Sequence, residues 1–208
     1  MDVFKAVSRN DYRQVLDFLN AGGDPNIMEP APGGGADSLL RNTMNIGTND
    51  ILLLLLEAGA DPNLGMTVPL DIAVTGARLD KIRILLGAGA DPNHQNPYGV
   101  TPLHFAAVAT TRIAEHYDAI RLLLDAGADP TLTNTRGMKP SQVATNPKIK
   151  ELLEEAEYAW NHPWIPEEQS RWPAYRRMEQ VSALSAFRER PGRTVLPREL
   201  QFDVLGRL

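Results

Sequence analysis

The chain has 208 residues, of which 43% are hydrophobic and 23% charged, and its formal net charge at pH 7 is −5. This composition is typical of a folded globular protein. The sequence contains no cysteine, which excludes disulfides and cysteine-ligated zinc. Ile51 to Leu56 is a run of six apolar residues, far short of the roughly 20 that a membrane-spanning helix needs.

The charge is unevenly distributed along the chain. Residues 159–208 contain eight Arg and six acidic residues, a net charge of +2. The preceding residues contain 13 Lys plus Arg and 20 acidic residues, a net charge of −7. An acidic body with a slightly basic end argues against nucleic acid as the main partner. We therefore expect neither a nucleic-acid nor a membrane partner.

One motif occurs four times, and its central glycine is Gly22, Gly59, Gly89 or Gly127. Two apolar residues precede each glycine by three and four positions, as in Leu55-Leu56-Glu57-Ala58-Gly59. The pattern predicts an apolar helix that a left-handed glycine ends, followed by an Asp-Pro turn. The glycine spacings of 37, 30 and 38 residues indicate stacked repeats of one supersecondary unit.

A second motif precedes the third and fourth copies, as Val68-Pro69-Leu70-Asp71-Ile72-Ala73 and Thr101-Pro102-Leu103-His104-Phe105-Ala106-Ala107. It predicts a short helix with a cap, a proline in the first turn, and Leu and Ala facing inward. Together the two motifs resemble the ankyrin repeat, from residue 1 to about residue 156. The resemblance implies an all-α fold, an ankyrin-repeat solenoid of about five helix-turn-helix repeats with a helical C-terminal extension.

The expected organisation is an ankyrin-repeat domain at 1–157 and an extension, rich in Trp and Pro and partly helical, at 158–208. The expected repeats are 1–26, 37–63, 68–93, 101–131 and 137–157, and the first and last have polar outer faces that suit terminal caps. Glu29 to Ala36 is expected to be a loop. About five extra residues in the fourth repeat are expected near Thr110 to Glu115, in its first helix or in the turn between its helices. Pro147 to Glu157 is expected to be the last repeat helix, followed by an irregular segment from Tyr158 to Trp172.

The last fifteen residues carry a pattern similar to the opening helix of an F-box, as in poxvirus-type ankyrin proteins. The residues that carry the similarity are Leu196, Pro197, Glu199, Leu200, Val204, Leu205 and Leu208. In that family the helix inserts into the Skp-type adaptor of a cullin ubiquitin ligase. Only about thirteen residues match, and the later F-box helices are absent. A closing amphipathic helix that packs against Tyr175 to Phe187 is the alternative interpretation.

No catalytic, phosphate-binding or dinucleotide-binding motif occurs in the sequence. The resemblance implies a structural hydrogen bond for His104, and His94 and Tyr98 lie in a loop that faces solvent, a partner or a metal. The repeated Asp24, Asp61, Asp91 and Asp129 are each expected to form a turn. We expect no catalytic residue, metal or cofactor.

The function that the resemblance implies is a protein-binding scaffold, which contacts its partner through the concave face and the loop tips. Because no targeting signal is visible in the sequence, we expect a cytoplasmic location. The expected contact residues are Asn45, Ile46, Thr75, Val108 and Ala109 on helices and Met66, Thr67, Pro97, Tyr98, Val100, Arg136 and Met138 in loops. Several are apolar or aromatic, which favours partner contact. The alternative is an enzyme, or its regulatory subunit, with a site in the Trp-rich segment around Trp160, His162, Trp164 and Trp172.

Overall fold

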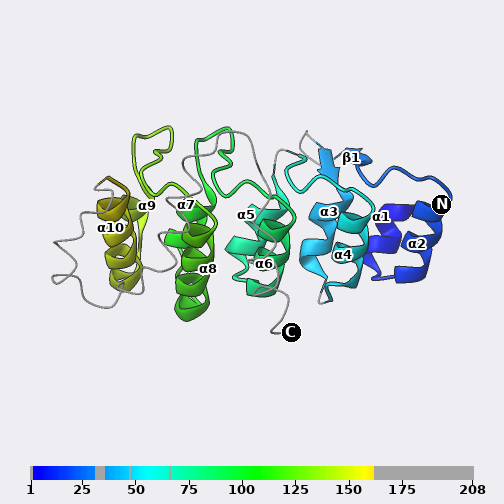
Figure 1. Ribbon diagram of the computed structural model, residues 1–208, viewed down its shortest axis with the longest axis horizontal. Helices are drawn as coiled ribbons and strands as arrows, with labels where there is room; N and C mark the ends of the chain where they lie inside the picture. The colour runs from blue at the N-terminus through cyan, green and yellow to red at the C-terminus, as the bar shows by residue number, and fades with distance from the viewer. Residues whose placement is uncertain (1, 31–35, 47, 66, 162–208) are drawn as a thin grey trace. The chain divides into compact units, whose positions relative to one another are not determined.

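The computed structural model describes residues 2–30, 36–46, 48–65 and 67–161 of the chain (Figure 1). The described residues form two compact units, of which unit 1 ends at Asp91 and unit 2 begins at Pro92. Helices dominate both units, as the sequence predicts. Within the described ranges no helix has the length and apolar character needed to cross a membrane.

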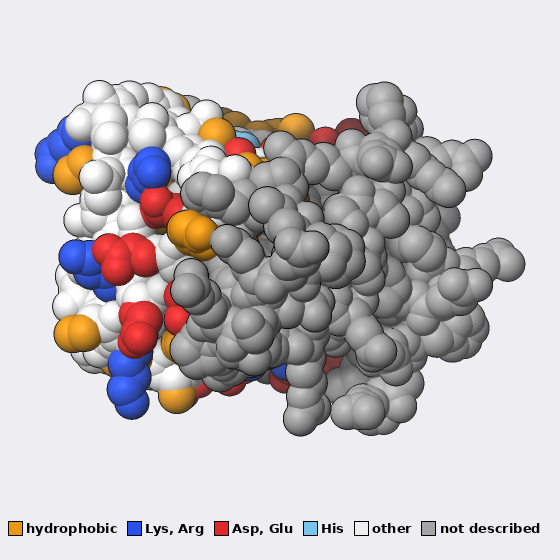
Figure 2. Space-filling model, turned by 60° about the vertical axis from the view of Figure 1, so that its left-hand side comes forward, with side chains coloured by type: hydrophobic (Ala, Val, Ile, Leu, Met, Phe, Trp, Pro, Cys, Tyr) orange, Lys and Arg blue, Asp and Glu red, His pale blue; other side chains and the backbone are white. Residues whose placement is uncertain are grey.

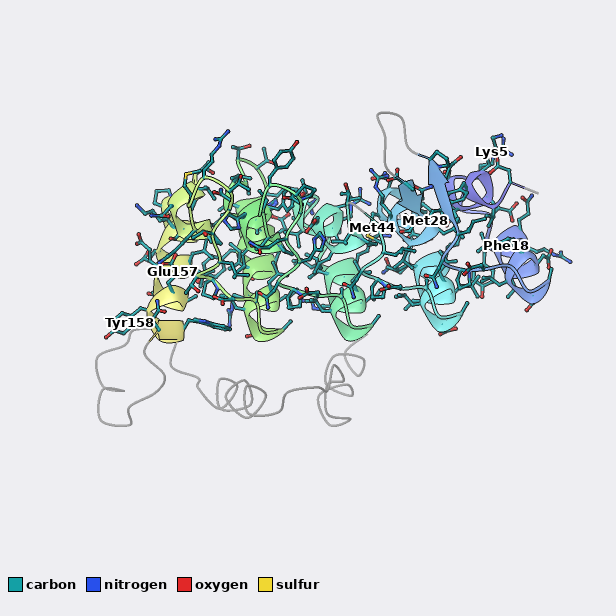
Figure 3. The ribbon with its side chains drawn as sticks, turned by 90° about the horizontal axis from the view of Figure 1, so that it is seen from above. Lys5, Phe18, Met28, Met44, Glu157 and Tyr158 are labelled. Carbon is teal, nitrogen blue, oxygen red and sulfur yellow. The ribbon has the colours of Figure 1, made fainter. Side chains whose placement is uncertain are left out.

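Unit 1 contains three pairs of helices, in which the first helices lie side by side and each second helix packs against its partner. The helices are α1 (Val3–Ser8), α2 (Tyr12–Asn20), α3 (Leu39–Asn42), the 3-10 helix η1 (Thr43–Asn45), α4 (Asp50–Glu57), α5 (Pro69–Thr75) and α6 (Leu79–Gly87). Their apolar faces form the core, whose largest members are Leu39, Leu40, Met44, Ile51, Leu52, Leu55, Leu70, Ile82 and Leu85. Met44, labelled in Figure 3, is fully buried in this core.

Two short strands correct the expectation that Glu29 to Ala36 is entirely a loop, whereas the described chain is dominated by helices as expected. Strands β1 (Met28–Pro30) and β2 (Ala36–Ser38) pair antiparallel, with Met28 opposite Ser38. Ser38 then caps α3, because its hydroxyl accepts a hydrogen bond from the Arg41 N–H at 3.2 Å. The Gly- and Pro-rich composition of residues 30–35 predicts a loop, and strands of only three residues have no clear sequence pattern of their own.

The described part of unit 2, residues 92–161, contains two pairs of helices, in which α7 lies beside α9 and α8 beside α10. The helices are α7 (Pro102–Ala107), α8 (Ile113–Asp125), α9 (Pro140–Val143) and α10 (Pro147–Asn161). Leu103, Ile120 and Leu123 are among its fully buried side chains. Figure 2 brings the α10 side forward, and basic and acidic side chains are interspersed on the described part of that face.

In unit 2 one prediction holds in part and one boundary was wrong. The extra residues of the fourth repeat lengthen the turn between its helices, one of the two expected places, and also the second helix, since α8 has 13 residues where α6 has nine. Helix α10 continues past Glu157 to Asn161, so the beginning of the segment expected to be irregular is helical. No proline or glycine occurs between Lys148 and Asn161, and nothing in the local sequence therefore stops this helix.

Within each unit, asparagine side chains at the turns bond to the backbone of the next turn. The Asn93 side chain donates to the Gly127 carbonyl at 3.0 Å and accepts from the Asp129 N–H at 2.6 Å. We call this pair of bonds an asparagine bridge. Asparagine bridges also join Asn26 to Gly59 and Asp61, and Asn63 to Gly89 and Asp91.

The fourth copy of the motif has threonine in place of asparagine. The Thr131 hydroxyl donates to the Asp129 carboxylate at 2.6 Å, within its own turn. No Gly-Ala-Asp-Pro sequence follows this copy. Threonine therefore replaces asparagine at the copy that has no following Gly-Ala-Asp-Pro turn for an asparagine bridge to contact.

The glycines at these turns have the predicted left-handed conformation, with φ between 83° and 91° at Gly22, Gly59, Gly89 and Gly127. The following aspartates form turns as predicted. The Asp61 carboxylate, for example, accepts from the Asn63 N–H at 2.8 Å. The carboxylate thereby holds the asparagine in place for its bridge.

Asn93→Ala should lower the free energy of unfolding by about 1–2 kcal/mol, because it removes both bonds of a half-buried asparagine bridge. Chemical denaturation of the full chain measures the change. Asn20→Ala, at an exposed position that ends α2, is the control. Equal stability of the two variants would contradict a stabilising role for the bridge.

One acidic side chain is buried within unit 1. Asp71 on α5 is 2% exposed, and burial raises the pKa of its carboxyl to about 7. The folded state therefore keeps a proton that the unfolded chain loses near pH 4. Asp71 consequently destabilises the fold progressively as the pH rises from about 4 to 7.

Asp71→Asn should remove this pH dependence, because an amide does not ionise in this range. The variant should gain stability relative to the natural chain between about pH 4 and pH 7, by an amount on the order of a few kcal/mol. Urea unfolding at several pH values measures the difference. Asp80→Asn on α6 is the control for loss of a carboxylate at an exposed position. Parallel stability curves for Asp71→Asn and the natural chain would disprove this effect.

Candidate functional site

The first candidate loop of unit 2 is a small hairpin from Asn96 to Val100. The Asn96 side-chain carbonyl accepts from the N–H of Tyr98 at 2.9 Å and of Val100 at 3.0 Å. The backbone closes the hairpin with a bond from the Asn96 N–H to the Val100 carbonyl at 3.2 Å. Tyr98 lies at the tip of this hairpin and is 71% exposed. A fixed backbone thus presents an aromatic ring to solvent.

The second candidate loop repeats this geometry from Asn134 to Met138. The Asn134 side-chain carbonyl accepts from the N–H of Arg136 at 2.9 Å and of Met138 at 3.1 Å. The Asn134 N–H donates to the Met138 carbonyl at 2.9 Å. Arg136, exposed at this tip, occupies the position that Tyr98 has in the first loop.

The two hairpins are bonded directly to each other. The Thr135 N–H donates to the Tyr98 carbonyl at 2.9 Å. The Gln95 amide donates to the carbonyls of Gly99 and Thr133, at 3.1 and 3.2 Å. The Tyr98 and Arg136 tips are therefore neighbours on one surface.

A close approach at Gly99 makes this arrangement specific. Gly99 has a φ of +68°, and a Cβ at this position would lie 3.1 Å from the Asn134 Cα and the Thr135 nitrogen. Gly137, in the other hairpin, has a φ of +73° but no atom within 4 Å of the corresponding Cβ position. Only Gly99 combines the left-handed conformation with close contact to the neighbouring hairpin.

His104 anchors the second hairpin to α7. Its Nδ1 accepts from the Thr101 N–H at 3.2 Å, and its Nε2 lies 2.9 Å from the Met138 carbonyl. Because a carbonyl can only accept, Nε2 carries the proton and the ring is neutral. Burial lowers the pKa of His104, which favours this neutral form. The predicted structural hydrogen bond of His104 is therefore confirmed. One of its partners is Met138, the last residue of the second hairpin.

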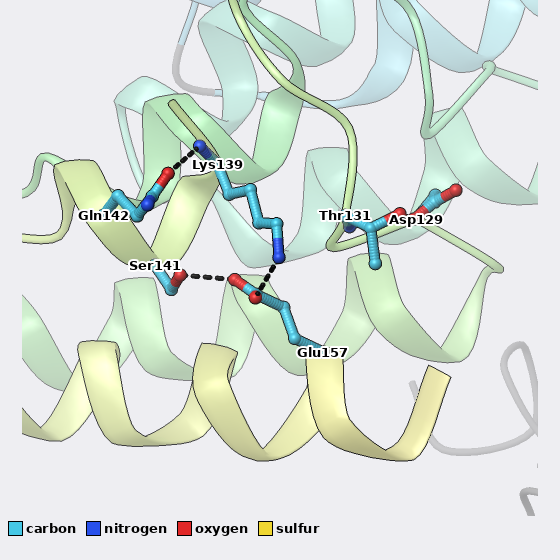
Figure 4. A network of polar contacts seen from close by, with 6 residues as sticks. All are labelled: Asp129, Thr131, Lys139, Ser141, Gln142 and Glu157. Carbon is cyan, nitrogen blue, oxygen red and sulfur yellow. Dashed lines mark hydrogen bonds and ion pairs between the residues drawn. The ribbon is translucent and has the colours of Figure 1, made fainter. Parts of the chain in front are cut away.

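A polar network fixes the other side of the same base (Figure 4). Glu157 on α10 forms an ion pair with Lys139 at 2.9 Å and accepts a hydrogen bond from the Ser141 hydroxyl. The Lys139 N–H donates to the Gln142 side chain at 2.8 Å. Figure 3 shows Glu157 and the adjacent Tyr158 at the end of α10. Helix α10 thus supports, through Glu157, the segment that carries Arg136 and Met138.

Five of the predicted contact residues come together on these hairpins. We call them the tip surface: Pro97, Tyr98, Val100, Arg136 and Met138. Pro97, Tyr98 and Arg136 are exposed, and Val100 and Met138 are half-buried. The sequence named these residues but did not show that two of the loops are bonded to each other.

The remaining predicted residues belong to other elements of the two units. In unit 1, Asn45 ends η1, Ile46 follows it, Thr67 lies in a loop, and Thr75 ends α5. All four are at least partly exposed. In unit 2, Val108 is exposed but lies just beyond the end of α7.

Ala109 corrects the expectation of an exposed contact residue. Its side chain is only 8% exposed, and it lies in the turn after α7 rather than on a helix. The Ala109 carbonyl accepts from the Thr145 hydroxyl at 2.9 Å, which places the residue under the following repeat. Ile46 and Val108 were also expected on helices, and each instead follows one.

Several predicted residues lie outside the described part of the chain. These are Met66, the F-box-like residues Leu196, Pro197, Glu199, Leu200, Val204, Leu205 and Leu208, and His162, Trp164 and Trp172 of the alternative enzyme site. Trp160 is described, and it lies in α10. Among the described residues no group of three or more His, Cys, Asp or Glu side chains is placed to hold a metal ion.

Sequence reasoning missed the residues that organise the tip surface. Gln95, Asn96, Asn134 and Thr135 make the bonds within and between the hairpins. A signal was present, because Asn96 and Asn134 each precede a glycine by three residues. An Asn-x-x-Gly pattern that recurs between repeats indicates two hairpins of the same type.

Residues 39–134 match the family model of ankyrin repeats (3 copies). The chain is also 30% identical over 114 residues to a protein of Rickettsia bellii (strain RML369-C) that is named for ankyrin repeats. That alignment covers 54% of this chain and 43% of the relative, so the chain spans less than half of the relative's length. These similarities and the helical structure support an all-α repeat fold of ankyrin type. Ankyrin repeats are generally protein–protein interaction modules.

Gly99→Ala should separate the two hairpins, because the added Cβ would lie too close to the backbone at Asn134 and Thr135. Gly137→Ala is the matched control, since it meets the same left-handed conformation in open space. Hydrogen exchange should show loss of protection at the Thr135 amide in Gly99→Ala and retained protection in Gly137→Ala. Equal exchange rates at Thr135 in the two variants would show that the close approach does not hold the tips together.

Proposed function

We propose that this chain is a protein-binding scaffold whose tip surface contacts a protein partner. The observation that carries the proposal is the exposed Tyr98 ring on a hairpin bonded to the Arg136 hairpin. Tyrosine and arginine are enriched among the residues that dominate protein–protein binding energy. A large aromatic side chain that is 71% exposed favours contact with another protein.

The rigidity of the tips supports the same function. Each hairpin is braced by an asparagine side chain and by its own backbone bond. A preorganised surface loses little conformational entropy when a partner binds. Tyrosine adds to this advantage, because it has only two side-chain torsions to restrict.

The exposed side of α8 is a less suitable binding surface. Asp118, Arg121 and Asp125 are exposed there. Exposed charges of both signs are typical of solvent-facing repeat surfaces, whereas the centres of protein interfaces are depleted in charge. The tip surface is therefore the better candidate within unit 2.

Tyr98→Ala in the full chain should reduce recovery of the partner by about tenfold or more, in line with the loss of a central aromatic contact. Affinity purification with quantitative mass spectrometry measures the recovery, and circular dichroism checks that the variant is folded. Asp118→Ala on α8 is the control. Unchanged recovery with folded Tyr98→Ala would refute the proposed role of the tip surface.

Delivery of the bound protein to a cullin ubiquitin ligase is a finer part of the proposal. It is supported by the sequence pattern from Leu196 to Leu208 alone, in which apolar residues recur every four positions. In this proposal the repeats bind the target, and the C-terminal segment binds a Skp-type adaptor. The two roles belong to different parts of the chain and can be separated by mutation.

Leu200→Asp should abolish recovery of the Skp-type adaptor and cullin from eukaryotic cells, because a carboxylate replaces an apolar contact residue. The same variant should still recover the partner that depends on Tyr98. Conversely, Tyr98→Ala should retain the adaptor and lose that partner. Recovery of the adaptor with Leu200→Asp, or its absence with the natural chain, would eliminate the ligase role.

A further inference from the structure

The loops that carry the tip surface differ in charge from the rest of the repeats. Residues 92–101 and 130–139 contain no Asp or Glu, and they contain Arg136 and Lys139. The turns and short strands of unit 1 carry Asp24, Glu29, Asp37 and Asp61. The tip surface is therefore a locally basic and aromatic region on an acidic chain.

Two acidic side chains adjoin the second loop and already have partners: Asp129 precedes residue 130, and Glu157 contacts Lys139. The Asp129 carboxylate accepts bonds from the Thr131 N–H at 2.8 Å and from its hydroxyl at 2.6 Å. Glu157 pairs with Lys139 at 2.9 Å. Neither carboxylate is thus available to neutralise the Arg136 side chain.

Arg136 is consequently the available cation of the tip surface. Its side chain is exposed, and it forms no ion pair with any residue in the described ranges. The Arg136 N–H donates a hydrogen bond to the Asn134 side chain, and the N–H of the preceding residue, Thr135, donates to the Tyr98 carbonyl. The backbone positions that carry the Arg136 guanidinium group and the Tyr98 ring are therefore adjacent and fixed by hydrogen bonds.

We infer that the tip surface binds an acidic, extended segment of the partner protein, with a carboxylate on Arg136 and an apolar side chain against the Tyr98 ring. This inference rests on the proposed scaffold function and names the class of partner. Arginine binds carboxylates through paired, charge-assisted hydrogen bonds. An aromatic ring beside it supplies apolar contact area.

The spacing of the tips favours an extended segment. Backbones joined by interstrand hydrogen bonds lie about 5 Å apart, and alternate side chains of an extended chain lie about 7 Å apart on one face. An acidic residue and an apolar residue two positions away can therefore reach both tips. The C-terminal segment of this chain is a poor occupant, since residues 159–208 have a net charge of +2.

The test is selection of a random-peptide phage library on the immobilised full chain. Four proteins are compared: the natural chain, Arg136→Glu, Tyr98→Ala, and the control Arg121→Glu, which makes the same charge change at an exposed position on α8. The readouts are the mean charge of the selected peptides and the affinity of the most enriched one. Arg136→Gln is a second variant, in case charge reversal disturbs the hairpin, and circular dichroism checks every fold.

The natural chain and Arg121→Glu are expected to select peptides rich in Asp and Glu with an apolar residue two positions away. Arg136→Glu should bind the most enriched acidic peptide about tenfold or more weakly, because a close opposite-charge pair becomes a like-charge pair. Arg136→Gln should weaken binding less, and Tyr98→Ala should also weaken it. Added salt should reduce binding by the natural chain.

Two other outcomes separate this inference from the function on which it rests. Selected peptides that depend on Tyr98 but show no acidic enrichment would overturn the acidic partner and leave the tip surface as a binding site. Selection of the same peptides by the natural chain, Tyr98→Ala and Arg136→Glu would overturn both the partner class and the binding site.

Discussion

The asparagine bridge is the interaction on which the remaining structure of each unit depends. At Asn93 one amide side chain satisfies the carbonyl of Gly127 and the N–H of Asp129, two groups at the end of the next repeat. The carbonyl that it reaches belongs to a left-handed glycine, and the N–H belongs to the aspartate that starts the next turn. Helix termination, turn formation and repeat spacing are therefore set together. A shift of one repeat along the next would break both bonds.

This fixed spacing between repeats sets the positions of the two hairpins of unit 2 relative to each other. With the turns held in register, the hairpins at Asn96 and Asn134 meet at the bond between Tyr98 and Thr135. His104 then ties the second hairpin to α7 through the Met138 carbonyl. The tip surface is thus held by hydrogen bonds of the backbone and of His104, which belong to the repeat architecture, rather than by contacts among its own exposed side chains. Substitution at a tip should accordingly change binding with little effect on folding.

The sequence predicted the elements whose cause is local. Four glycines with apolar residues before them and Asp-Pro after them predicted the helix ends, and the same glycines have positive φ in the structure. The strands beside residues 31–35 and the extension of α10 were missed because a three-residue strand and an unbroken helix leave no distinct local signal. Ala109 was placed wrongly for a related reason. Its carbonyl accepts a hydrogen bond from Thr145, which lies in the next repeat and far along the sequence.

The sequence by itself thus determined the repeat, its period, its turns and a set of exposed loop residues, because each follows from backbone preferences and apolar spacing within a few positions. Only the tertiary structure decided which of those residues act together. Tyr98 and Arg136 become neighbours through a hydrogen bond at Thr135, and the space for that bond exists only because Gly99 has no side chain. A contact between residues 37 positions apart depends on how one repeat packs on the next, and no local pattern encodes that geometry.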